Sequence, residues 1–391
     1  MDLRFALQKT LDPRVTFTRA SSGTYAGSDG VLQTASTDVP RFDHNPTTDE
    51  SLGLLVEEAR TNLAIYSEQF NDASWTKTDC TITANTVVSP DGLTTGDSIT
   101  SSAGLLGRVV QTINQTTGTA YTFSTFAKAN QYTFCQLRIT GTVVGAVTRA
   151  YFNLTTGAIT GAANCTASIT PVGNGWYRCS ITYTTILTAA ASPRVYGQVD
   201  AADTVGDGTS GIYIWGAQME AGAFPTSYIP TTTATVTRAA DVASVTGANF
   251  SAWYNQTEGT FFAEYRTPAS GTRGIAGFND NTANERIELF TSGTDPKMLV
   301  VDGGTTQADL DGGIIVASIM TKTAGAYAVN DFSIVHAAGT AVTDTNGTLP
   351  TVNRLLIGAD QAGNYQNGRT KRLTYWPVRL ANPTLQSITT P

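Results

Sequence analysis

The stretch GIYIW at residues 211–215 decides the fold class, because it is short and apolar on both faces. A run of this kind after a Gly is typical of a strand in the middle of a β-sandwich. Two further stretches, YTFS at 121–124 and CQLRI at 135–139, alternate apolar and polar residues. This pattern is typical of strands with one solvent-exposed face. Together with tight turns such as GNG at 173–175, they predict an all-β sandwich or barrel.

The composition of the 391-residue chain points to the same class. It has 37 Gly, abundant Thr and only 14% charged residues, whereas about 25% is usual. β-branched Thr has a low helix propensity and is favoured in strands that are partly exposed to solvent. The net charge of −7 argues against binding to nucleic acid or docking on anionic lipid, both of which need clustered Lys and Arg.

The rare residues limit the chemistry. The two His, His44 and His336, lie far apart, and no Cys-x-x-Cys pair occurs, so neither a His-rich metal site nor a zinc ribbon is expected. The four Cys are expected to be buried thiols, with a disulfide between Cys165 and Cys179 as the alternative. No cofactor is expected.

The N-terminus, MDLRFALQKTLDPR at 1–14, lacks the apolar core of a secretory signal. No run approaches 18 apolar residues, so no membrane insertion is expected. We expect a chain that is made and assembled in a cytoplasm.

The chain divides into three regions by pattern. Residues 1–65 hold charged clusters and turn signals and are expected to form an extended N-terminal arm; residues 66–234 and 235–391 each carry regular strand signals and are expected to form one sandwich each. The Pro/Thr run at 226–233 is the candidate linker, and a short helix is expected at 383–388.

A five-residue echo links the start of the first region to the start of the third. TFTRA at 16–20 is matched by TVTRA at 235–239. It is too short to establish a tandem repeat, and we interpret it as a similar way of entering each domain.

A set of short motifs runs through the first 241 residues: TRAS at 18–21, PRFD at 40–43, RTNL at 60–63, FNDASWTK at 70–77, GWYR at 175–178 and IWGAQME at 214–220. In combination they resemble bacteriophage head-spike or tail-fibre proteins, and residues 66–234 look like a carbohydrate-binding-module jelly roll. The resemblance implies a homo-oligomer, a trimer, attached to the particle by its N-terminal region.

The last 150 residues carry a second pattern. LLIG at 355–358, NG at 367–368 and YWPVRL at 375–380 resemble a concanavalin A-like (laminin G-like) sandwich. Such folds serve many functions, so the resemblance implies binding by analogy alone.

Motifs for catalysis are sparse. Glycosidases need two carboxylates at a set separation, and Glu285 and Glu288, three residues apart, would lie on opposite faces of a strand. Neither a Gly-x-Ser-x-Gly motif nor a phosphate-binding loop occurs. The sequence therefore predicts that the chain is not an enzyme.

An acidic, Gly-containing loop with Asp200, Asp203 and Asp207 precedes the strand at 211–219. Oxygen-rich loops bind calcium in proteins, so these residues are a candidate structural calcium site. The alternative is a solvated turn, in which Asp and Gly are favoured anyway.

A sugar site needs an aromatic platform with a few fixed donors and acceptors. Trp215 and Trp376 are expected in the cores. The candidates for binding are residues in turn-like or polar settings, with packing inside or between domains as the alternative: Trp75, Trp176, Trp253, Tyr254, Asn364 and Tyr365.

These observations predict a phage virion protein, a head spike or tail fibre, which contacts capsid or tail proteins and binds host cell-surface glycans. A purely structural decoration protein without a ligand is the first alternative, and a polysaccharide-degrading enzyme is the second.

Overall fold

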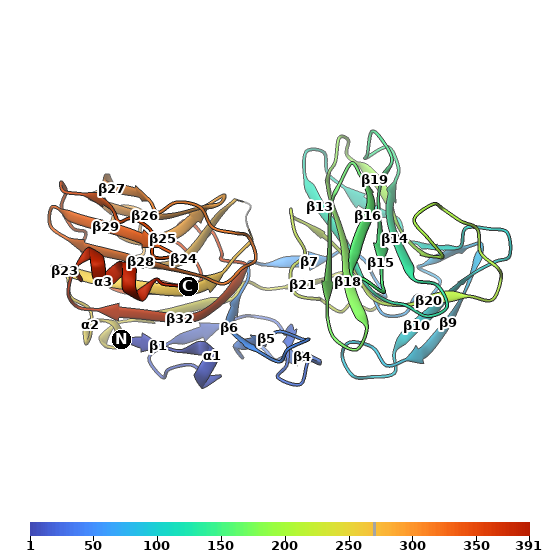
Figure 1. The fold of residues 1–391 in the computed structure, drawn as a ribbon, viewed down its shortest axis with the longest axis horizontal. Coiled ribbons are helices and arrows are strands. Elements are labelled where there is room, and N and C mark those ends of the chain that lie inside the picture. Colours follow the sequence, from blue (N-terminus) through green and yellow to red (C-terminus); the bar gives the residue numbers. More distant parts are fainter. Residues whose placement is uncertain (269–270) are drawn as a thin grey trace.

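The computed structural model describes residues 1–268 and 271–391, and these form two β-sandwich lobes lying side by side (Figure 1). The all-β class and the two sandwiches predicted from the sequence are confirmed. We call residues 1–62 with 236–391 the terminal lobe and residues 63–235 the central lobe. Both ends of the chain lie in the terminal lobe (Figure 1).

The terminal lobe consists of two packed sheets, each of which combines strands from both ends of the chain. Sheet 1 has the order β30 (Val342–Asp344), β29 (Asp331–His336), β28 (Thr321–Ala328), β23 (Glu258–Arg266), β32 (Gly368–Trp376), β6 (Ser51–Val56) and β5 (Arg41–His44), with β1 (Asp2–Leu3) also on β32. Sheet 2 has the order β2 (Thr16–Thr18), β22 (Val242–Thr246), β31 (Arg354–Ile357), β24 (Thr272–Asn279), β25 (Arg286–Ser292), β26 (Asp295–Asp302) and β27 (Thr305–Asp311).

The expected division of the chain differs from the structure at the N-terminus. In place of an extended arm over residues 1–65, β1 and β6 pair with β32, and β2 pairs with β22. Leu3, Phe17 and Leu54 are buried in one core with Phe261 and Leu355. The physical reason is that this region contributes apolar side chains, among them Phe17 of β2 and residues 54–56 of β6, and burial of such surface in a sheet is stabilising.

The central lobe is a second sandwich with its own core, which includes Phe123, Leu137 and Ile214. Sheet 3 has the order β17 (Thr166–Pro171), β18 (Trp176–Thr184), β13 (Ala120–Lys128), β20 (Gly211–Ala221), β10 (Gly96–Ser101) and β9 (Cys80–Val87). Sheet 4 has the order β16 (Ala158–Ala163), β15 (Thr148–Asn153), β14 (Phe134–Thr140), β19 (Ala189–Gln198), β11 (Arg108–Val110) and β8 (Thr76–Thr78), with β12 (Ile113–Gln115) on β19.

Two short strands carry the chain between the lobes. β7 (Arg60–Asn62) leads out of the terminal lobe and β21 (Val236–Arg238) leads back, and they pair antiparallel with Asn62 opposite Val236. The central lobe is therefore inserted into the terminal lobe (Figure 1). A separate hairpin, β3 (Gly23–Ala26) with β4 (Leu32–Ala35), belongs to the N-terminal part of the chain.

The expected linker at 226–233 is packed over residues 226–229 and at Thr231, whereas Pro230, Thr232 and Thr233 are exposed. Thr226, Tyr228 and Thr231 are all buried, and Tyr228 packs with Phe126 and Trp215. Pro and Thr residues predict an exposed connection here, but the hydroxyl and carbonyl groups of Thr231 are hydrogen-bonded to Ala64 and Ser67.

Helices are few among the described residues: α1 (Phe5–Gln8), α2 (Ala248–Ser251) and α3 (Asn382–Ile388). The helix expected at 383–388 is α3, which begins one residue earlier, with Ala381 as its N-cap. None of these helices has the length and apolar character that crossing a bilayer requires. All four Cys are free thiols, and Cys135 and Cys179 are buried.

Candidate functional site

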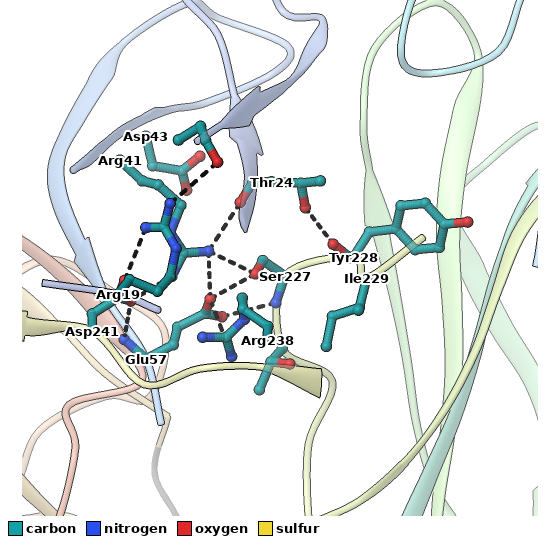
Figure 2. A network of polar contacts seen from close by, with 12 residues as sticks. Arg19, Thr24, Arg41, Asp43, Glu57, Ser227, Tyr228, Ile229, Arg238 and Asp241 are labelled. Atoms are coloured by element: carbon teal, nitrogen blue, oxygen red, sulfur yellow. Dashed lines mark hydrogen bonds and ion pairs between the residues drawn. The ribbon is translucent and has the colours of Figure 1, made fainter. Parts of the chain in front are cut away.

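A network of buried charges joins the two lobes (Figure 2). It is drawn from three separate parts of the chain, and each member is less than a tenth exposed: Arg19, Arg41, Glu57, Arg238 and Asp241. Buried charges are costly unless they are paired and hydrogen-bonded, so the arrangement of these five side chains is tightly constrained.

Asp241 lies at the centre of this network. One carboxylate oxygen accepts from Arg19 Nη1 at 3.1 Å, and the other accepts from Arg41 Nη2 at 2.5 Å. The backbone N–H of Glu57 also donates to Asp241, at 2.8 Å. A single carboxylate therefore neutralises two buried guanidinium groups and fixes the start of the segment that leaves sheet 1.

Glu57 carries the network into the central lobe. Its carboxylate accepts from the backbone N–H of Ser227 at 2.8 Å and from the Ser227 hydroxyl at 2.7 Å, and it pairs with Arg41 at 2.8 Å. Thr24 of β3 adds a hydrogen bond from its hydroxyl to the carbonyl of Tyr228 at 2.5 Å. These contacts hold the 226–231 segment of the central lobe against the terminal lobe (Figure 2).

The five-residue echo has a structural counterpart here. Arg19 of the first copy pairs with Asp241, and Arg238 of the second lies 3.6 Å from Glu57. The matching residues thus enter one shared charge network, whereas the sequence suggested one entry point for each of two domains.

Glu57 makes the network sensitive to acid. Burial alone would raise the pKa of Glu57, but the charges of Arg238 and Arg41 and the hydrogen bonds from Ser227 outweigh it and hold this pKa well below its usual range. A carboxyl group with a lowered folded-state pKa stabilises the fold above its unfolded-state pKa, near 4.5. That contribution is lost as the pH falls from this value towards the folded-state pKa.

We therefore expect the free energy of unfolding to fall as the pH is lowered below about 5. The decrease should be smaller in Glu57→Gln, which cannot titrate at this position. Urea unfolding at a series of pH values measures both slopes, and equal slopes for the two proteins would contradict this role of Glu57.

A second contact fixes the lobes relative to each other. The ring of Phe224, from the central lobe, lies beneath the guanidinium groups of Arg60 at 5.1 Å and Arg273 at 4.8 Å. Such cation–π contacts contribute about 0.5–2 kcal/mol each. Because Arg273 belongs to β24 of the terminal lobe, this contact crosses the junction.

Beside this junction the lobes enclose a cleft of about 560 Å³. Its terminal-lobe wall includes Asp43, Arg266, Asn367 and Arg369. Asp43 is 2% exposed; it accepts from the backbone of Ala26 at 2.7 Å and from Arg369 at 2.6 Å. Arg369 is therefore held in place while part of its guanidinium group remains exposed.

Arg266 adds a further positive group to this wall. Burial and the nearby charge of Arg369 lower its pKa. Among the described residues, no carboxylate lies within ion-pair distance of Arg266. The wall thus offers the planar guanidinium groups of Arg266 and Arg369 to whatever occupies the cleft, whereas the amide of Asn367 is engaged by Glu58 and Tyr365.

The central-lobe wall is rich in hydroxyl groups. β17 is an edge strand, and its exposed side chains Thr166, Ser168 and Thr170 line the cleft. On the next strand, Arg178 donates to the carbonyl of Thr226 at 2.5 Å and to the Ser124 hydroxyl at 3.1 Å. Burial lowers the pKa of Arg178.

Tyr25 of β3 lies where two hollows meet. It is half-buried and lines both the interlobe cleft and a neighbouring hollow of about 290 Å³. His44 lines both hollows as well; it is 4% exposed, and its Nε2 atom has no hydrogen-bond partner among the described residues. An aromatic ring at the junction of two polar hollows can serve as a stacking platform.

The sequence candidates for sugar binding all lie outside this cleft. The prediction is wrong for two of them, Trp75 and Trp176, because both are buried. Trp75 is 0% exposed and packs on Phe70 with 4.9 Å between ring centroids, and Trp176 is 1% exposed and donates to the carbonyl of Val88. Their polar sequence neighbours suggested exposure, but tight turns direct both rings inward.

Trp253 and Tyr254 belong to an aromatic cluster at the base of the terminal lobe. Trp253 lies 5.1 Å and Tyr254 5.3 Å from the ring of Tyr375, and both pack on Phe250. Both are half-buried against the core. Packing between domains is the alternative expected for this pair, whereas the structure packs both rings within the terminal lobe.

Asn364 and Tyr365 lie in a loop that is closed by its own hydrogen bonds. Asn364 donates from its side chain and its backbone to the carboxylate of Asp360, at 2.7 and 2.8 Å. Tyr365 forms a β-bridge with Ala359 and packs against the core of the terminal lobe. The structure places this pair on the terminal lobe, apart from the residues that line the cleft.

The three aspartates of the candidate calcium site have separate protein partners. Asp203 accepts from Arg149 at 2.6 Å and from the Tyr151 hydroxyl at 2.6 Å. Asp200 accepts from Thr204 and Asp207 from Ser210, each within its own turn. Within the described ranges, no three acidic, His or Cys side chains gather as metal ligands would.

Sequence reasoning missed every residue of the cleft walls. Asp43, Tyr25, Arg266 and Arg369 come from strands far apart in sequence, and no local motif links them. The one available signal was PRFD at 40–43, which contains Asp43 and Arg41 but was interpreted as part of an arm.

The chain was compared with family models and with curated proteins, and no match was found in either. Solved structures that resemble it include the Ruminococcus gnavus IT-sialidase CBM40 bound to α2,3 sialyllactose, at 15% identity over 34% of this chain and 84% of that one, with a TM-score of 0.31. They also include Trypanosoma rangeli sialidase in complex with the inhibitor DANA (10% identity, 75% of this chain, 60% of that one, TM-score 0.31). A third is mouse laminin α1 chain, domains LG4-5 (10% identity, 68% of this chain, 84% of that one, TM-score 0.25).

One sequence-based prediction is corrected at this point. The statement that the chain is not an enzyme is wrong as an exclusion, because an inhibitor-bound sialidase is among the structures it resembles. Likeness at this level assigns no activity to the chain.

Proposed function

We propose that this chain binds carbohydrate in the cleft between its two lobes. The observation that carries the proposal is the composition of the cleft: Arg266, Arg369 and the carboxylate of Asp43 on one wall, a row of hydroxyls on the other, and Tyr25 where the cleft meets a second hollow. Sugars present apolar C–H faces ringed by hydroxyl groups, and such ligands need an aromatic platform together with fixed donors and acceptors. A volume of about 560 Å³ suits a short oligosaccharide.

We further propose that the protein belongs to a bacteriophage virion, as a head spike or tail fibre, and that its ligand is a glycan of the host cell surface. The motifs from 18–21 to 214–220, which resemble those of phage spikes and fibres, support this reading. Attachment to capsid or tail proteins would use the terminal lobe, since the N-terminal residues are strands of that lobe. Assembly as a homotrimer would make weak binding strong through multivalency.

The binding proposal is tested by substituting Tyr25 and exposing the full chain to an array of defined bacterial surface glycans. Tyr25→Ala removes the platform and should weaken the affinity for any bound glycan about tenfold or more, equivalent to about 1.4 kcal/mol. Tyr25→Phe keeps the ring and should stay within a few fold of the parent.

Binding that survives Tyr25→Ala unchanged, or a folded chain that binds no glycan on the array, would overturn the proposal. The virion proposal has its own test. Sedimentation of the purified chain should give a trimer, and immunogold labelling of phage particles should place it on the head or tail; a monomer that is absent from particles would contradict it.

A further inference from the structure

The outer face of sheet 4 in the central lobe carries a row of arginines. On β14, Cys135, Leu137 and Ile139 face the core, so the alternating residues Gln136 and Arg138 face outward. The same alternation on β15 and β19 turns further arginines towards the same face.

The strand register lines up these arginines. Arg138 lies directly opposite Arg149 of β15 on one side and opposite Arg194 of β19 on the other. Three guanidinium side chains thus stand side by side across three neighbouring strands. Directly opposed side chains have Cβ atoms about 5 Å apart, and like charges in this position destabilise a sheet.

Two arginines at the edges of this face are neutralised. Arg149 pairs with Asp203 at 2.6 Å. Arg108, on β11 beyond β19, stands opposite Tyr196, two residues along from Arg194, and lies 3.6 Å from Asp79. These acidic partners come from loops at either side of the face.

The middle of the row is different. Among the described residues, neither Arg138 nor Arg194 has a carboxylate within 4 Å, and the Nε atom of each is buried without a hydrogen-bond partner. The one side-chain hydrogen bond of Arg194 goes to the Tyr196 hydroxyl at 3.4 Å. Two adjacent guanidinium groups therefore have unused donors and uncompensated charge.

We propose that Arg138 and Arg194 form a binding site for an oxyanion group, carboxylate or sulfate, of an acidic polysaccharide. The planar guanidinium fork suits two-point hydrogen bonding to such oxygens, and an anion between the two side chains relieves their repulsion. Next along the face, Thr140 stands opposite Ser192 and offers hydroxyl groups for the rest of the sugar ring. Two charges on a chain of net charge −7 suit a polymer with sparse charge better than the dense phosphates of nucleic acid.

This site goes beyond the cleft proposal, because none of its arginines lines the cleft, and each proposal can fail alone. The test uses the full chain and three polymers with one backbone: neutral dextran, carboxymethyl-dextran and dextran sulfate. We expect the charged polymers to bind by biolayer interferometry, more weakly as salt increases, and neutral dextran to bind at least tenfold more weakly. Stronger binding of the carboxylate or of the sulfate form identifies the oxyanion.

The double substitution Arg138→Gln, Arg194→Gln should weaken binding of the charged polymer at least tenfold, since each arginine contributes charge-assisted hydrogen bonds. Lys297→Gln with Lys322→Gln changes the net charge equally on the other lobe and should leave binding within about twofold. The arginine variant should melt no lower than the parent, because the substitution removes repulsion.

If both double variants lose binding of the charged polymer equally, the attraction depends on net charge alone, and the proposed site is contradicted. Equal binding of neutral dextran, or unchanged binding after loss of the arginines, would also overturn it. A lower melting temperature of the arginine variant would show that the row serves the fold and would contradict the proposal. Substituting Tyr25 should leave this binding unchanged, so the two sites are told apart.

Discussion

A chain that begins at Val236 is expected to show no cooperative unfolding transition, although it lacks only Thr235 of the sandwich that the sequence predicts over residues 235–391. It lacks β1, β5 and β6 of sheet 1 and β2 of sheet 2. Leu3, Phe17 and Leu54 leave the core with those strands. Removing one large buried side chain costs about 2–5 kcal/mol, and whole domains are stable by only about 5–15 kcal/mol.

The same topology predicts a chain that should fold. Asn62 and Val236 are opposite partners in the β7–β21 pair, so an Asn-Gly turn can join them directly in place of residues 63–235. The rejoined chain should show strand-type circular dichroism and a cooperative melt, at a lower temperature than the parent because Glu57 loses its donors from Ser227. Residues 63–235 alone should also fold, since they have their own core.

Thermal melts of the three chains, 236–391, the rejoined chain and 63–235, test whether the central lobe is an insertion in the terminal lobe. A cooperative transition for 236–391 alone, comparable to that of the rejoined chain, would contradict the insertion of the central lobe into the terminal lobe.

Asp241→Asn is expected to cost about 3–5 kcal/mol of unfolding free energy, because a buried charge left without its partner is strongly destabilising. The substitution keeps the size of the side chain but removes the charge that faces both Arg19 and Arg41. All three side chains are fully buried, so water cannot compensate.

Asp309→Asn is the matched control. Asp309 is half exposed and pairs with Lys297 at 3.4 Å, and exposed ion pairs contribute at most about 1 kcal/mol. Urea unfolding measures both variants against the parent. Equal, small effects would show that the network at Asp241 has no special role in stability.

The fold class was predictable because it depends on local pattern. Ile212 and Ile214 of the GIYIW stretch are fully buried in β20, between β13 and β10. The alternating stretch at 135–139 lies in β14, with Leu137 and Ile139 in the core. The first pattern is a short run that is apolar on both faces and the second is an alternation, and each indicates which faces of its strand are buried.

The partners of the strands were not predictable in the same way. Residues 51–56 form β6, but nothing in their local sequence says that this strand pairs with residues 368–370. Such pairing depends on which apolar faces remain uncovered after the rest of the chain has folded. The prediction of an N-terminal arm is therefore wrong, because the strands of this region complete the sandwich of the terminal lobe.

The candidate sites likewise combine features that local sequence predicts with features that depend on strand pairing. Outward-facing Arg138 could be inferred from alternation with Leu137 and Ile139, but its position opposite Arg149 and Arg194 depends on register. Single aromatic residues such as Trp75 were judged by their neighbours in sequence, which say little about the direction in which a turn points the ring.

Hydrogen–deuterium exchange of the full chain with and without a glycan selected on the array tests the central claim most directly, because it reports where the ligand lies. Binding in the interlobe cleft predicts slower exchange in β3, in β17 and in residues 223–228, which come from both lobes. Protection confined to either lobe away from these segments, or no protection at saturating glycan, would contradict it.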